Sequence, residues 1–399
     1  MNEPKLRFKA DDGSEFPEWE EKYFSEIFEK TTNKNTCYGT DKIISVANMY
    51  YKEDASVSNE DYLKTYNVML YGDIAFEGHV NKEYSHGRFV LNDIGDGIVS
   101  HIFDVFHPKN LSLYSVGFWK EYIRHEPIMG RILVRCTKSS TMMRNLVAKE
   151  FLQELVPVPC FPEQQKIAEF LSTIDTVIAK QKETVSAWEE RKKGVMQKLF
   201  SQEVRFKADD GSKFPEWEEK KIDDLFYKVN ERNNGQFGKD KWISVAKMYY
   251  QDEDKVTSNN IDTRTYVMRV GDMSFEGHPN KEFKYGRFVV NDIGDGIISE
   301  LFPIYRHKEN YILKYWKYAI QVDSIMQKIY RKSITSSGAS SNKLDDDDFK
   351  RQSILVPCLA EQRKIADCLS SFDEVIEKQK ATLAAWEELK KGLLQQMFV

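Results

Sequence analysis

Two stretches of the chain decide its fold. Residues 162–200 read PEQQKIAEFLSTIDTVIAKQKETVSAWEERKKGVMQKLF, and residues 360–398 read AEQRKIADCLSSFDEVIEKQKATLAAWEELKKGLLQQMF. After its first residue, neither stretch contains glycine or proline until Gly194 and Gly392. Both are rich in Glu, Lys, Gln, Ala and Leu, which favour helix. Each stretch is predicted to form one long helix, beginning near Glu163 in the first because the prolines before that residue disfavour helix.

The apolar residues of both helices recur in alternating steps of four and three, if a few polar positions such as Gln181 and Lys192 are counted. This 3.5-residue repeat is typical of a coiled coil rather than of a looser amphipathic helix. At 1.5 Å per residue, each helix is about 57 Å long. The seam is assigned to Ile167, Leu171, Ile174, Ile178, Gln181, Val185, Trp188, Ile365, Leu369, Phe372, Ile376, Gln379, Leu383 and Trp386.

Such a seam needs a partner helix, and the chain carries two matching ones. One alternative is that each helix packs only on its own globular part. We favour pairing between the two helices, which is antiparallel if two equal units are related by a pseudo-twofold axis. That register places three pairs together: Gln181 with Gln379, Trp188 with Phe372, and Trp386 with Ile174. A single polar layer of this kind fixes the register of an apolar seam.

The repetition extends well beyond the helices. Residues 7–22 read RFKADDGSEFPEWEEK and residues 205–220 read RFKADDGSKFPEWEEK, with one difference. Residues 76–100 and 275–299 differ at only six of twenty-five positions. The copies lie about 198 residues apart, whereas solenoid repeats have periods of ~20–50 residues. The chain is therefore a tandem duplication of a whole domain together with the helix that follows it.

The globular part of each copy mixes short β-rich runs with turn residues, such as Phe89–Leu91 and Gly95–Gly97. The predicted fold class is α+β. Two mixed α/β domains are joined by two long antiparallel coiled-coil helices, as a pseudo-twofold tandem repeat. The predicted divisions are residues 1–160 (first domain), 161–200 (central helix), 201–358 (second domain) and 359–399 (C-terminal helix). The expected rod with one domain at each end suits a bipartite ligand such as duplex DNA.

Composition excludes several classes of protein. Hydrophobic residues make up 41% and charged residues 30% of the chain, which is typical of a globular protein. The sequence has no run of eighteen apolar residues for a membrane span and no apolar signal peptide at its start. The five cysteines show no C-x-x-C spacing. A disulfide framework or zinc site is therefore not expected. We expect the protein to lie in a reducing cytoplasm.

The net charge of −5 argues mildly against a nucleic-acid partner, but local charge reverses that interpretation. Residues 120–149 hold seven basic and two acidic residues, and residues 299–344 hold eight basic and three acidic ones. Both segments interleave cations with aromatic residues, and basic clusters bind phosphate. A solvated amphipathic helix is the alternative. The predicted DNA contacts are Lys120, Arg124, Arg131, Arg135, Lys138, Arg144, Lys314, Lys317, Lys328, Arg331, Lys332 and Lys343.

These basic segments also differ between the two copies. A common scaffold that carries different contact surfaces explains this, because base contacts specify sequence while phosphate contacts only position the protein. The acidic run Asp345–Asp348 has no counterpart in the first copy, which has Val147–Glu150 at that place, and it is unfavourable beside phosphate. We interpret it as a helix start before Phe349 or as a solvated turn.

A matching F-E-G-H-x-N-K-E segment in each copy places a histidine beside a carboxylate and a lysine. No recognised metal motif uses this spacing. Contact with DNA or a structural hydrogen bond is favoured over catalysis. The candidate residues are His79, Asn81, Lys82, His278, Asn280 and Lys281. The segment Asn92–Gly97 is predicted to be a tight turn, because it lacks the ligand pattern of a calcium loop.

Several catalytic motifs are missing from the sequence. It contains neither a phosphate-binding G-x-x-x-x-G-K-[ST] loop nor a G-x-G-x-x-G after a strand. It also lacks the Asn/Asp-Pro-Pro-Tyr/Phe tetrapeptide expected in an adenine methyltransferase. We therefore predict no catalytic residues, no bound cofactor and no metal site in this chain.

The chain resembles the specificity subunit of type I restriction–modification systems. Three features carry the resemblance: the helix openings Pro162–Ala168 and Glu361–Ala366, the helix endings Lys192–Phe200 and Lys390–Phe398, and the P-E-W-E-E-K that precedes each globular part. These features occur in both copies, so the resemblance covers essentially the whole chain. The chain departs from the family pattern in two ways. Ala360 stands in the second copy where the first has Pro162, and the two domains are more alike than is usual in this family.

The resemblance implies that each globular part is a target-recognition domain that reads one half of an interrupted double-stranded DNA site. It implies that the paired helices set the spacer and dock two methylation subunits, which bind S-adenosylmethionine. Two restriction subunits that use ATP and Mg²⁺ complete the complex. This chain itself then has no catalytic role. The alternatives are a stand-alone bivalent regulator or decoy, and a detached recognition module.

Overall fold

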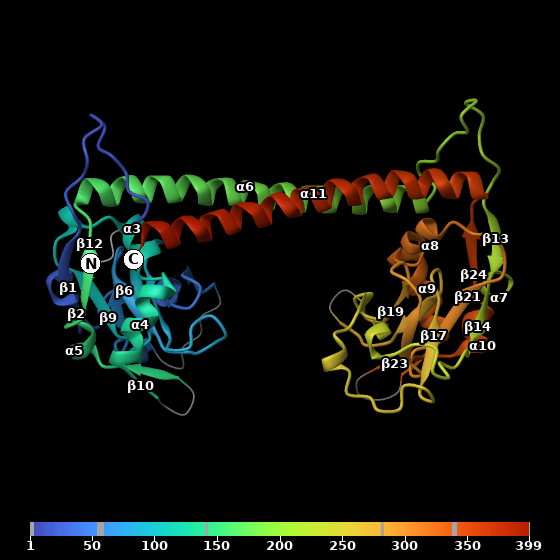
Figure 1. Ribbon diagram of the computed structural model, residues 1–399, viewed down its shortest axis with the longest axis horizontal. Coiled ribbons are helices and arrows are strands. Elements are labelled where there is room, and N and C mark those ends of the chain that lie inside the picture. The colour runs from blue at the N-terminus through green and yellow to red at the C-terminus, as the bar shows by residue number, and fades with distance from the viewer. Residues whose placement is uncertain (1–3, 54–59, 140–142, 281–282, 337–340, 399) are drawn as a thin grey trace. The chain divides into compact units, whose positions relative to one another are not determined.

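The computed structural model describes residues 4–53, 60–139, 143–280, 283–336 and 341–398 (Figure 1). It divides the chain into two compact units: unit 1 comprises Met1–Lys182 and Ala381–Val399, and unit 2 comprises Glu183–Lys380. The cut falls inside both predicted helices, so each unit holds part of each helix. The four divisions proposed from the sequence stay an interpretation.

A four-stranded antiparallel sheet forms the centre of unit 1, in the order β2-β9-β6-β7. Its strands are β2 (Phe28–Thr31), β9 (Val105–Pro108), β6 (Ile74–Glu77) and β7 (Arg88–Leu91). Smaller antiparallel pairs are β1 (Glu20–Tyr23) with β12 (Leu155–Val158), β3 (Ile44–Ser45) with β4 (Tyr50–Tyr51), β5 (Asn67–Met69) with β8 (Gly97–Val99), and β10 (Thr137–Ser139) with β11 (Arg144–Leu146). All four residues of β6 are buried, so this strand is covered on both faces.

Short helices pack around this sheet in unit 1. They are α1 (Phe24–Ile27), α2 (Glu60–Leu63), α3 (Val116–Tyr122), α4 (Glu126–Cys136) and α5 (Ala148–Phe151), with 3₁₀ turns at Thr40–Lys42 and Leu111–Leu113. The long helix α6 (Phe161–Phe200) has 40 residues. It begins two residues before the predicted start, because Pro162 lies in the first turn, where a helix does not need its N–H.

Unit 2 repeats this architecture. Its central antiparallel sheet has the order β14-β21-β18-β19. The strands are β13 (Glu218–Lys221), β14 (Phe226–Val229), β15 (Ile243–Ser244), β16 (Tyr249–Tyr250), β17 (Thr265–Met268), β18 (Met273–Glu276), β19 (Arg287–Val290), β20 (Gly296–Ser299), β21 (Ile304–His307), β22 (Ile334–Ser336), β23 (Asn342–Leu344) and β24 (Ser353–Val356). The helices are α7 (Ile222–Leu225), α8 (Leu313–Ala319), α9 (Asp323–Ser333), α10 (Asp346–Lys350) and α11 (Leu359–Met397), with 3₁₀ turns at Lys239–Lys241 and Glu253–Lys255.

The two long helices pair within both units. Four ion pairs join them: Lys390–Asp175 (2.8 Å) and Lys182–Glu387 (2.9 Å) in unit 1, and Lys192–Asp373 (2.6 Å) and Lys380–Glu189 (2.9 Å) in unit 2. Within each unit, residue numbers rise along one helix as they fall along the other. The predicted antiparallel pairing is therefore confirmed, and with it the predicted α+β fold of two mixed domains and two long helices.

The predicted seam residues lie on the inner side of this pair. Eight are buried: Ile167, Leu171, Ile174, Ile178, Val185, Ile365, Leu369 and Ile376. The other six are half-buried: Gln181, Trp188, Phe372, Gln379, Leu383 and Trp386. The Trp188 and Phe372 rings meet at 6.0 Å between centroids, as the antiparallel register predicts. The Gln181–Gln379 and Trp386–Ile174 contacts stay predictions.

The start of each long helix is tied to the segment that opens its unit. Glu163, whose side chain has no exposed surface, accepts hydrogen bonds from Arg7 Nε at 3.0 Å and Nη2 at 2.8 Å. It also accepts one from Trp19 Nε1 at 3.2 Å. In unit 2, Glu361 is bound in the same way by Arg205 and Trp217. In each unit, the repeated opening segment and the repeated start of the long helix therefore meet at a buried carboxylate.

Each unit has one large apolar core, and both long helices contribute to it. In unit 1 the core includes Ile167 and Leu171 from the start of α6, and Met397 and Phe398 at the end of α11. In unit 2, Leu199 and Phe200 from the end of α6 join residues from the start of α11. The packing of a helix on its own globular part and its pairing with the other helix therefore occur together.

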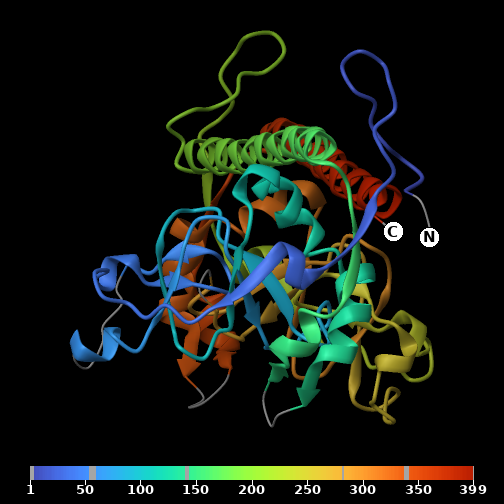
Figure 2. The ribbon, with the colours of Figure 1, turned by 90° about the vertical axis from the view of Figure 1, so that its left-hand side faces the viewer.

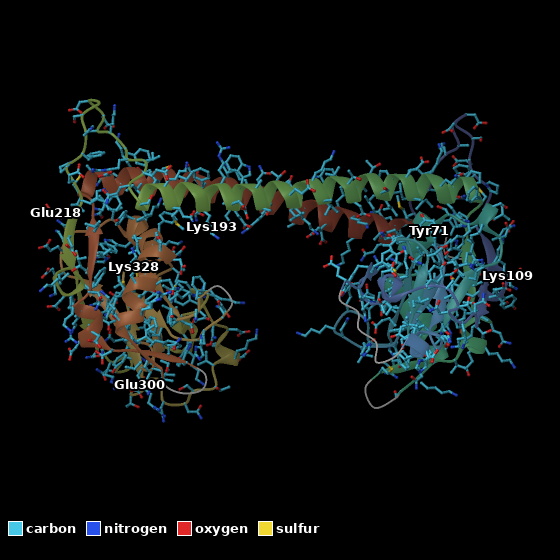
Figure 3. The ribbon with its side chains drawn as sticks, turned by 180° about the vertical axis from the view of Figure 1, so that it is seen from behind. Tyr71, Lys109, Lys193, Glu218, Glu300 and Lys328 are labelled. Atoms are coloured by element: carbon cyan, nitrogen blue, oxygen red, sulfur yellow. The ribbon has the colours of Figure 1, made fainter. Side chains whose placement is uncertain are left out.

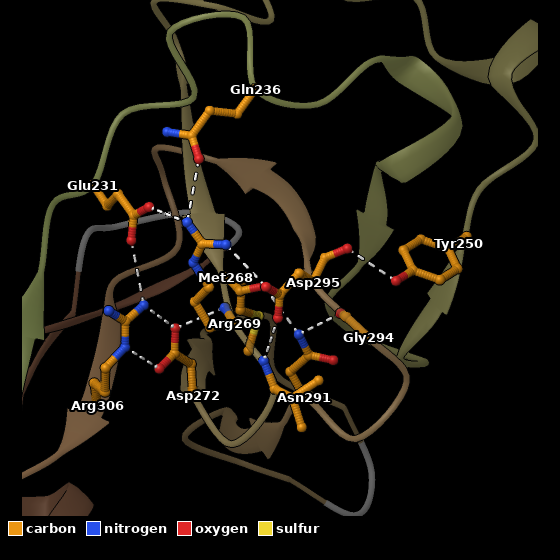
Figure 4. A network of polar contacts seen from close by, with 11 residues as sticks. Glu231, Gln236, Tyr250, Met268, Arg269, Asp272, Asn291, Gly294, Asp295 and Arg306 are labelled. Atoms are coloured by element: carbon orange, nitrogen blue, oxygen red, sulfur yellow. Dashed lines mark hydrogen bonds and ion pairs between the residues drawn. The ribbon is translucent and has the colours of Figure 1, made fainter.

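The Asn-Asp-Ile-Gly-Asp-Gly segments are tight turns, as predicted. In unit 2, Asn291 Nδ2 donates to Gly294 O at 2.8 Å, and Gly294 has φ of 140°, which favours glycine. Asp295 ends the turn and accepts from Arg269 Nη1 at 2.9 Å (Figure 4). Beside it, burial raises the pKa of Asp272 even though Arg306 pairs with this carboxylate at 2.7 Å.

Replacing Arg7 by alanine tests the buried ion pair. The Arg7→Ala variant leaves the Glu163 carboxylate buried without its cation, which costs about 3 kcal/mol or more. Lys9→Ala is the matched control, because Lys9 pairs with Glu15 on the surface with both side chains over 60% exposed. That variant is expected to leave the free energy of unfolding nearly unchanged. Chemical unfolding measures both, and equal losses would contradict the analysis.

A second prediction concerns His125, which is 8% exposed beside the Phe398 ring. Burial, assisted by Arg131, lowers the pKa of His125 to about 4. Because the pKa falls on folding, the neutral ring stabilises unit 1 above pH 6.5, and that contribution is lost as pH falls toward 4. The full loss is about 3 kcal/mol.

Unit 2 supplies the control, because buried Val322 directly precedes α9 where His125 directly precedes α4. The His125→Val variant is therefore expected to unfold at the same pH 7 temperature as the parent or higher, and to lose less stability at pH 4. Calorimetry at both pH values measures the difference. If the difference in unfolding temperature between parent and variant does not change with pH, His125 does not titrate in this range.

Candidate nucleic-acid interface

The structure brings two of the predicted contact regions together. The turn after β6 carries His79, and the β10–β11 hairpin carries Lys138 and Arg144. Arg144 N–H donates to Gly78 O at 2.8 Å, so the hairpin lies directly on the turn. In unit 2, Asn342 N–H donates to Gly277 O at the same distance. The two regions therefore form one candidate interface per unit.

The glycine of each F-E-G-H motif permits this approach. A Cβ atom on Gly78 would lie 2.1 Å from Arg144 O, and a Cβ on Gly277 would lie 2.1 Å from Asn342 O. No side chain fits in that space unless the hairpin moves. The glycine is thus explained by the hairpin, a contact that the sequence alone did not reveal.

A buried carboxylate orients the histidine of each interface. In unit 2, Glu276 is buried and accepts from His278 N–H at 2.9 Å, while its Oε1 lies 2.6 Å from His278 Nδ1. Glu77 and His79 repeat the arrangement in unit 1. Both histidine side chains are more than 60% exposed. With Nδ1 held by the carboxylate, Nε2 can accept a hydrogen bond, or donate one when the ring is protonated.

The asparagines of the same turns have a structural role. Asn81 Oδ1 accepts from the N–H groups of Glu83 and Tyr84, both at 2.8 Å, and Asn280 Oδ1 accepts from Phe283 N–H at 2.8 Å. Their carbonyl oxygens therefore close the turn. Lys82 is exposed beside Asn81, and Lys281 lies outside the described residues.

The predicted cations on the basic segments differ in exposure. Eight are exposed: Arg131, Arg135, Lys138, Lys314, Lys328, Arg331, Lys332 and Lys343. Four are half-buried: Lys120, Arg124, Arg144 and Lys317. Most lie on α3, α4, α8, α9 and the two hairpins, and Figure 3 shows their side chains, with Lys328 on α9 labelled. In each unit, exposed cations of this kind can attract phosphate.

Three of these cations already pair with acidic residues of their own unit. Lys120 pairs with Asp93 at 2.6 Å, and Arg135 binds Glu154 through Nε at 2.9 Å. Lys317 pairs with Asp292. Such pairing reduces what each cation can contribute to phosphate binding. Contact between these residues and DNA stays a prediction, with less support than for the exposed lysines.

The aromatic residues between these cations are not available to a ligand. Phe118, Trp119, Tyr122, Tyr315, Trp316, Tyr318 and Tyr330 are all buried in the two cores. The interleaved pattern reflects amphipathic helices, with aromatic residues inside and cations outside. The solvated amphipathic helix considered above therefore describes the local structure, and the aromatic residues give no support to nucleic-acid stacking.

The acidic run in unit 2 begins a helix, as one of its two interpretations predicted. Asp345 caps α10 by accepting from Asp348 N–H at 2.9 Å. Asp346 accepts from the buried Tyr305 hydroxyl at 2.7 Å. The first copy has the corresponding helix α5, in which Glu150 is the one acidic residue. The run is therefore explained by capping and by Tyr305.

A cavity of about 570 Å³ adjoins the interface of unit 2. Its lining includes His278 and Lys343, which the sequence predicted, together with Lys228, Asn230 and Tyr266, which it did not. Pockets of this size hold small ligands, and this lining offers cations and hydrogen-bonding groups. Among the described residues, no three His, Cys, Asp or Glu side chains gather as metal ligands.

Sequence reasoning also missed an arginine at each interface. Arg287 donates to Ala246 O and lies with its guanidinium 4.7 Å from the Phe283 ring centre, under the turn that carries His278. Arg88 repeats this in unit 1 beside the Tyr84 ring. The sequence did carry a signal for these arginines, because both follow the His-containing turn in a segment that the two copies largely share.

Comparison with known proteins agrees with this geometry. Residues 17–186 and 215–385 each match the family described as the type I restriction modification DNA specificity domain. The two matches cover most of the chain, which therefore belongs to this family. Each match spans one globular part and a portion of the long helix that follows it.

Two curated relatives from Methanocaldococcus jannaschii are named as specificity subunits of type I restriction enzymes, MjaX and MjaVIII. They are 26% and 24% identical to this chain. The matches cover 53% and 60% of the chain and the same shares of the relatives, so the chain spans little more than half the length of either.

Solved structures show the same fold. The type I restriction–modification S subunit from M. genitalium is 12% identical, with a TM-score of 0.51 over 100% of this chain and 99% of its own. A chain from a structure describing complex assembly and conformational transition of the type I R-M system is 14% identical. Its TM-score is 0.56, over 96% of this chain and 98% of its own.

Among the described residues, none of the helices has the length and apolar character needed to cross a membrane.

Replacing the exposed hairpin lysines tests the interface. Lys138→Ala and Lys343→Ala are each expected to weaken binding to duplex DNA of any sequence, and to reduce the slope of log K against log salt by about 0.9. Lys317→Ala is the control, because that lysine already pairs with Asp292. Fluorescence anisotropy across a salt series gives the slopes. A larger effect for Lys317 than for the hairpin lysines would count against this interface.

Proposed function

We propose that this chain is the DNA-reading specificity subunit of a type I restriction–modification enzyme. Unit 1 and unit 2 each read one half of an interrupted double-stranded site. The observation that carries the proposal is the presence of two complete copies of the family domain in one chain. Each copy has its own interface of an oriented histidine and a basic hairpin.

The distribution of differences between the copies supports sequence reading. Residues 76–100 and 275–299, which include the His-containing turns, differ at only six of twenty-five positions, whereas the hairpins β10–β11 and β22–β23 carry different residues on the same backbone hydrogen bonds. A scaffold held constant while its contact surface changes is suited to reading two base sequences. Because the scaffolds are so alike, we expect two related half-sites.

The partners follow from this function. The antiparallel helices set the spacer between the half-sites and dock two adenine-methylation subunits, which supply S-adenosylmethionine. Two restriction subunits that use ATP and Mg²⁺ join them in the full complex. In this proposal the chain contributes recognition and no catalytic group, and it acts in the cytoplasm.

A methylome tests the proposal directly. The chain is expressed with its methylation subunit in a host that lacks adenine methylation, and modified bases are then sequenced. We expect one interrupted motif with a methylated adenine in each half. If a complex that assembles and holds its cofactor methylates nothing, the chain is instead a binding-only regulator or decoy.

A further inference from the structure

The hairpins β3–β4 and β15–β16 keep their sequence while the chain beside them changes. Residues 44–51 and 243–250, which form the two hairpins, share seven of eight positions. Residues 52–66 and 251–265, which follow them directly, share one of fifteen. Both units therefore depend on the sequence of this hairpin, and neither the interface described above nor the long helices explain why.

The one position that differs between the hairpins is exposed at their turns. It is Asn48 in unit 1 and Lys247 in unit 2. Among the residues that the structure describes, neither side chain has a hydrogen-bond or ion-pair partner. Two residues further on, the shared Tyr50 and Tyr249 are 49% and 46% exposed. These side chains face solvent, so the packing of each unit does not account for them.

The backbone of each turn is fixed from inside the unit. Met49 has φ of 48° and Met248 has φ of 49°, a left-handed conformation that residues other than glycine seldom adopt. The Met49 side chain is buried in a small apolar cluster, and Met248 packs against the matching cluster of unit 2. Met49 N–H also donates to Ser45 O at 2.8 Å. A turn held in this way presents the exposed residue before the methionine in a defined direction.

An arginine joins this turn to the histidine turn of the interface. Arg88 Nη2 donates to Ala47 O at 2.5 Å, and Arg88 lies opposite Glu77 in the pairing of β6 with β7. Glu77 in turn accepts from His79 N–H at 3.0 Å. Arg287 repeats these contacts in unit 2. The β3–β4 turn and the histidine turn are therefore neighbouring loops of one surface.

This surface continues to the basic hairpin. The histidine turn of unit 1 accepts a hydrogen bond from the β10–β11 hairpin through Gly78 O. Figure 2 shows that hairpin at the end of unit 1 opposite the long helices. Three loops of unit 1 thus meet away from the helix pair, and a substitution on the β3–β4 turn leaves the pairing of the long helices untouched.

Asparagine and lysine suit different bases in the major groove. An asparagine side chain can accept from adenine N6 and donate to adenine N7, whereas the ammonium group of a lysine donates to guanine O6 and N7. The turns of the two units offer one residue of each kind on the same backbone. One exchange at this position can therefore change which base is preferred without rebuilding the scaffold.

We propose that the β3–β4 and β15–β16 turns read bases directly, with Asn48 contacting an adenine in one half-site and Lys247 a guanine at the equivalent position of the other. This inference rests on the proposed function, because it requires each unit to read one half-site. The shared residues of the hairpin fix the turn, and the single variable residue selects the base. The two half-sites then differ as adenine against guanine at this position, in addition to differences that the hairpins β10–β11 and β22–β23 introduce.

Exchanging the two residues tests the inference through the methylated motif. Asn48→Lys and Lys247→Asn chains are each expressed with the methylation subunit in a host that lacks adenine methylation. We expect Asn48→Lys to replace adenine by guanine at one position of one half-site, and Lys247→Asn to make the opposite replacement in the other half-site. The remaining positions and the spacer stay as in the parent. An unchanged motif in both variants would overturn the inference.

Asn48→Ala covers the case in which an exchanged residue blocks methylation. This variant removes the contact without adding a charge, and its unfolding temperature should match that of the parent because Asn48 has no partner within its unit. Fluorescence anisotropy with duplexes that differ by one base pair should show the preference for the parent base falling about tenfold. Equal weakening on every duplex would mean that Asn48 reads no base, which contradicts the inference.

Lys255→Asn is the matched control for unit 2. It makes the same change as Lys247→Asn on an exposed lysine that already pairs with Asp252 at 3.5 Å, and its motif should equal that of the parent. If Lys247→Asn keeps the parent motif and only lowers the salt dependence of binding, Lys247 contacts phosphate and its assignment to guanine is wrong. If the unchanged chain methylates nothing, the proposed function itself fails before any variant is compared.

Discussion

The buried carboxylates Glu163 and Glu361 are the constraint on which each unit depends. A carboxylate with almost no exposed surface is tolerated only with a cation and hydrogen-bond donors around it. The arginine and tryptophan that meet this need come from a segment about 150 residues away in sequence. Satisfying one charge thus fixes the opening segment, the edge strand after it and the first turn of the long helix.

The neighbouring glutamine extends this junction. Gln164 donates to Pro159 O at 3.0 Å and accepts from Ser115 N–H at 3.1 Å, so the helix start also holds the loop before α3. The Glu-Gln pair that opens each long helix is therefore a structural junction between the reading domain and the helix. This placement explains why each long helix begins with two polar residues even though both are buried.

The sequence was sufficient for the features that depend on periodicity and repetition. The heptad steps predicted both long helices, and the duplication predicted their antiparallel pairing and the Trp188–Phe372 contact. Long-range polar contacts have no periodic signature, so Glu163 with Arg7, Gly78 with Arg144 and the pairing of Lys120 with Asp93 could not be predicted. The burial of the aromatic residues beside the cations could not be predicted for a related reason, because composition does not tell which face of a helix is buried.

Unit 1 is built from two separate segments of the chain, and this has a consequence for its synthesis. Its core closes with Met397 and Phe398, from the second of its two segments, against Phe118 and Tyr122. Unit 2 is made of one continuous segment. As the chain leaves the ribosome, the domain that is made first is therefore the one that is finished last, because Phe118 and Tyr122 lack their contacts with Phe398 until the end of α11 emerges. Until then only unit 2 has its complete core, so unit 1 exposes apolar surface for longer during synthesis.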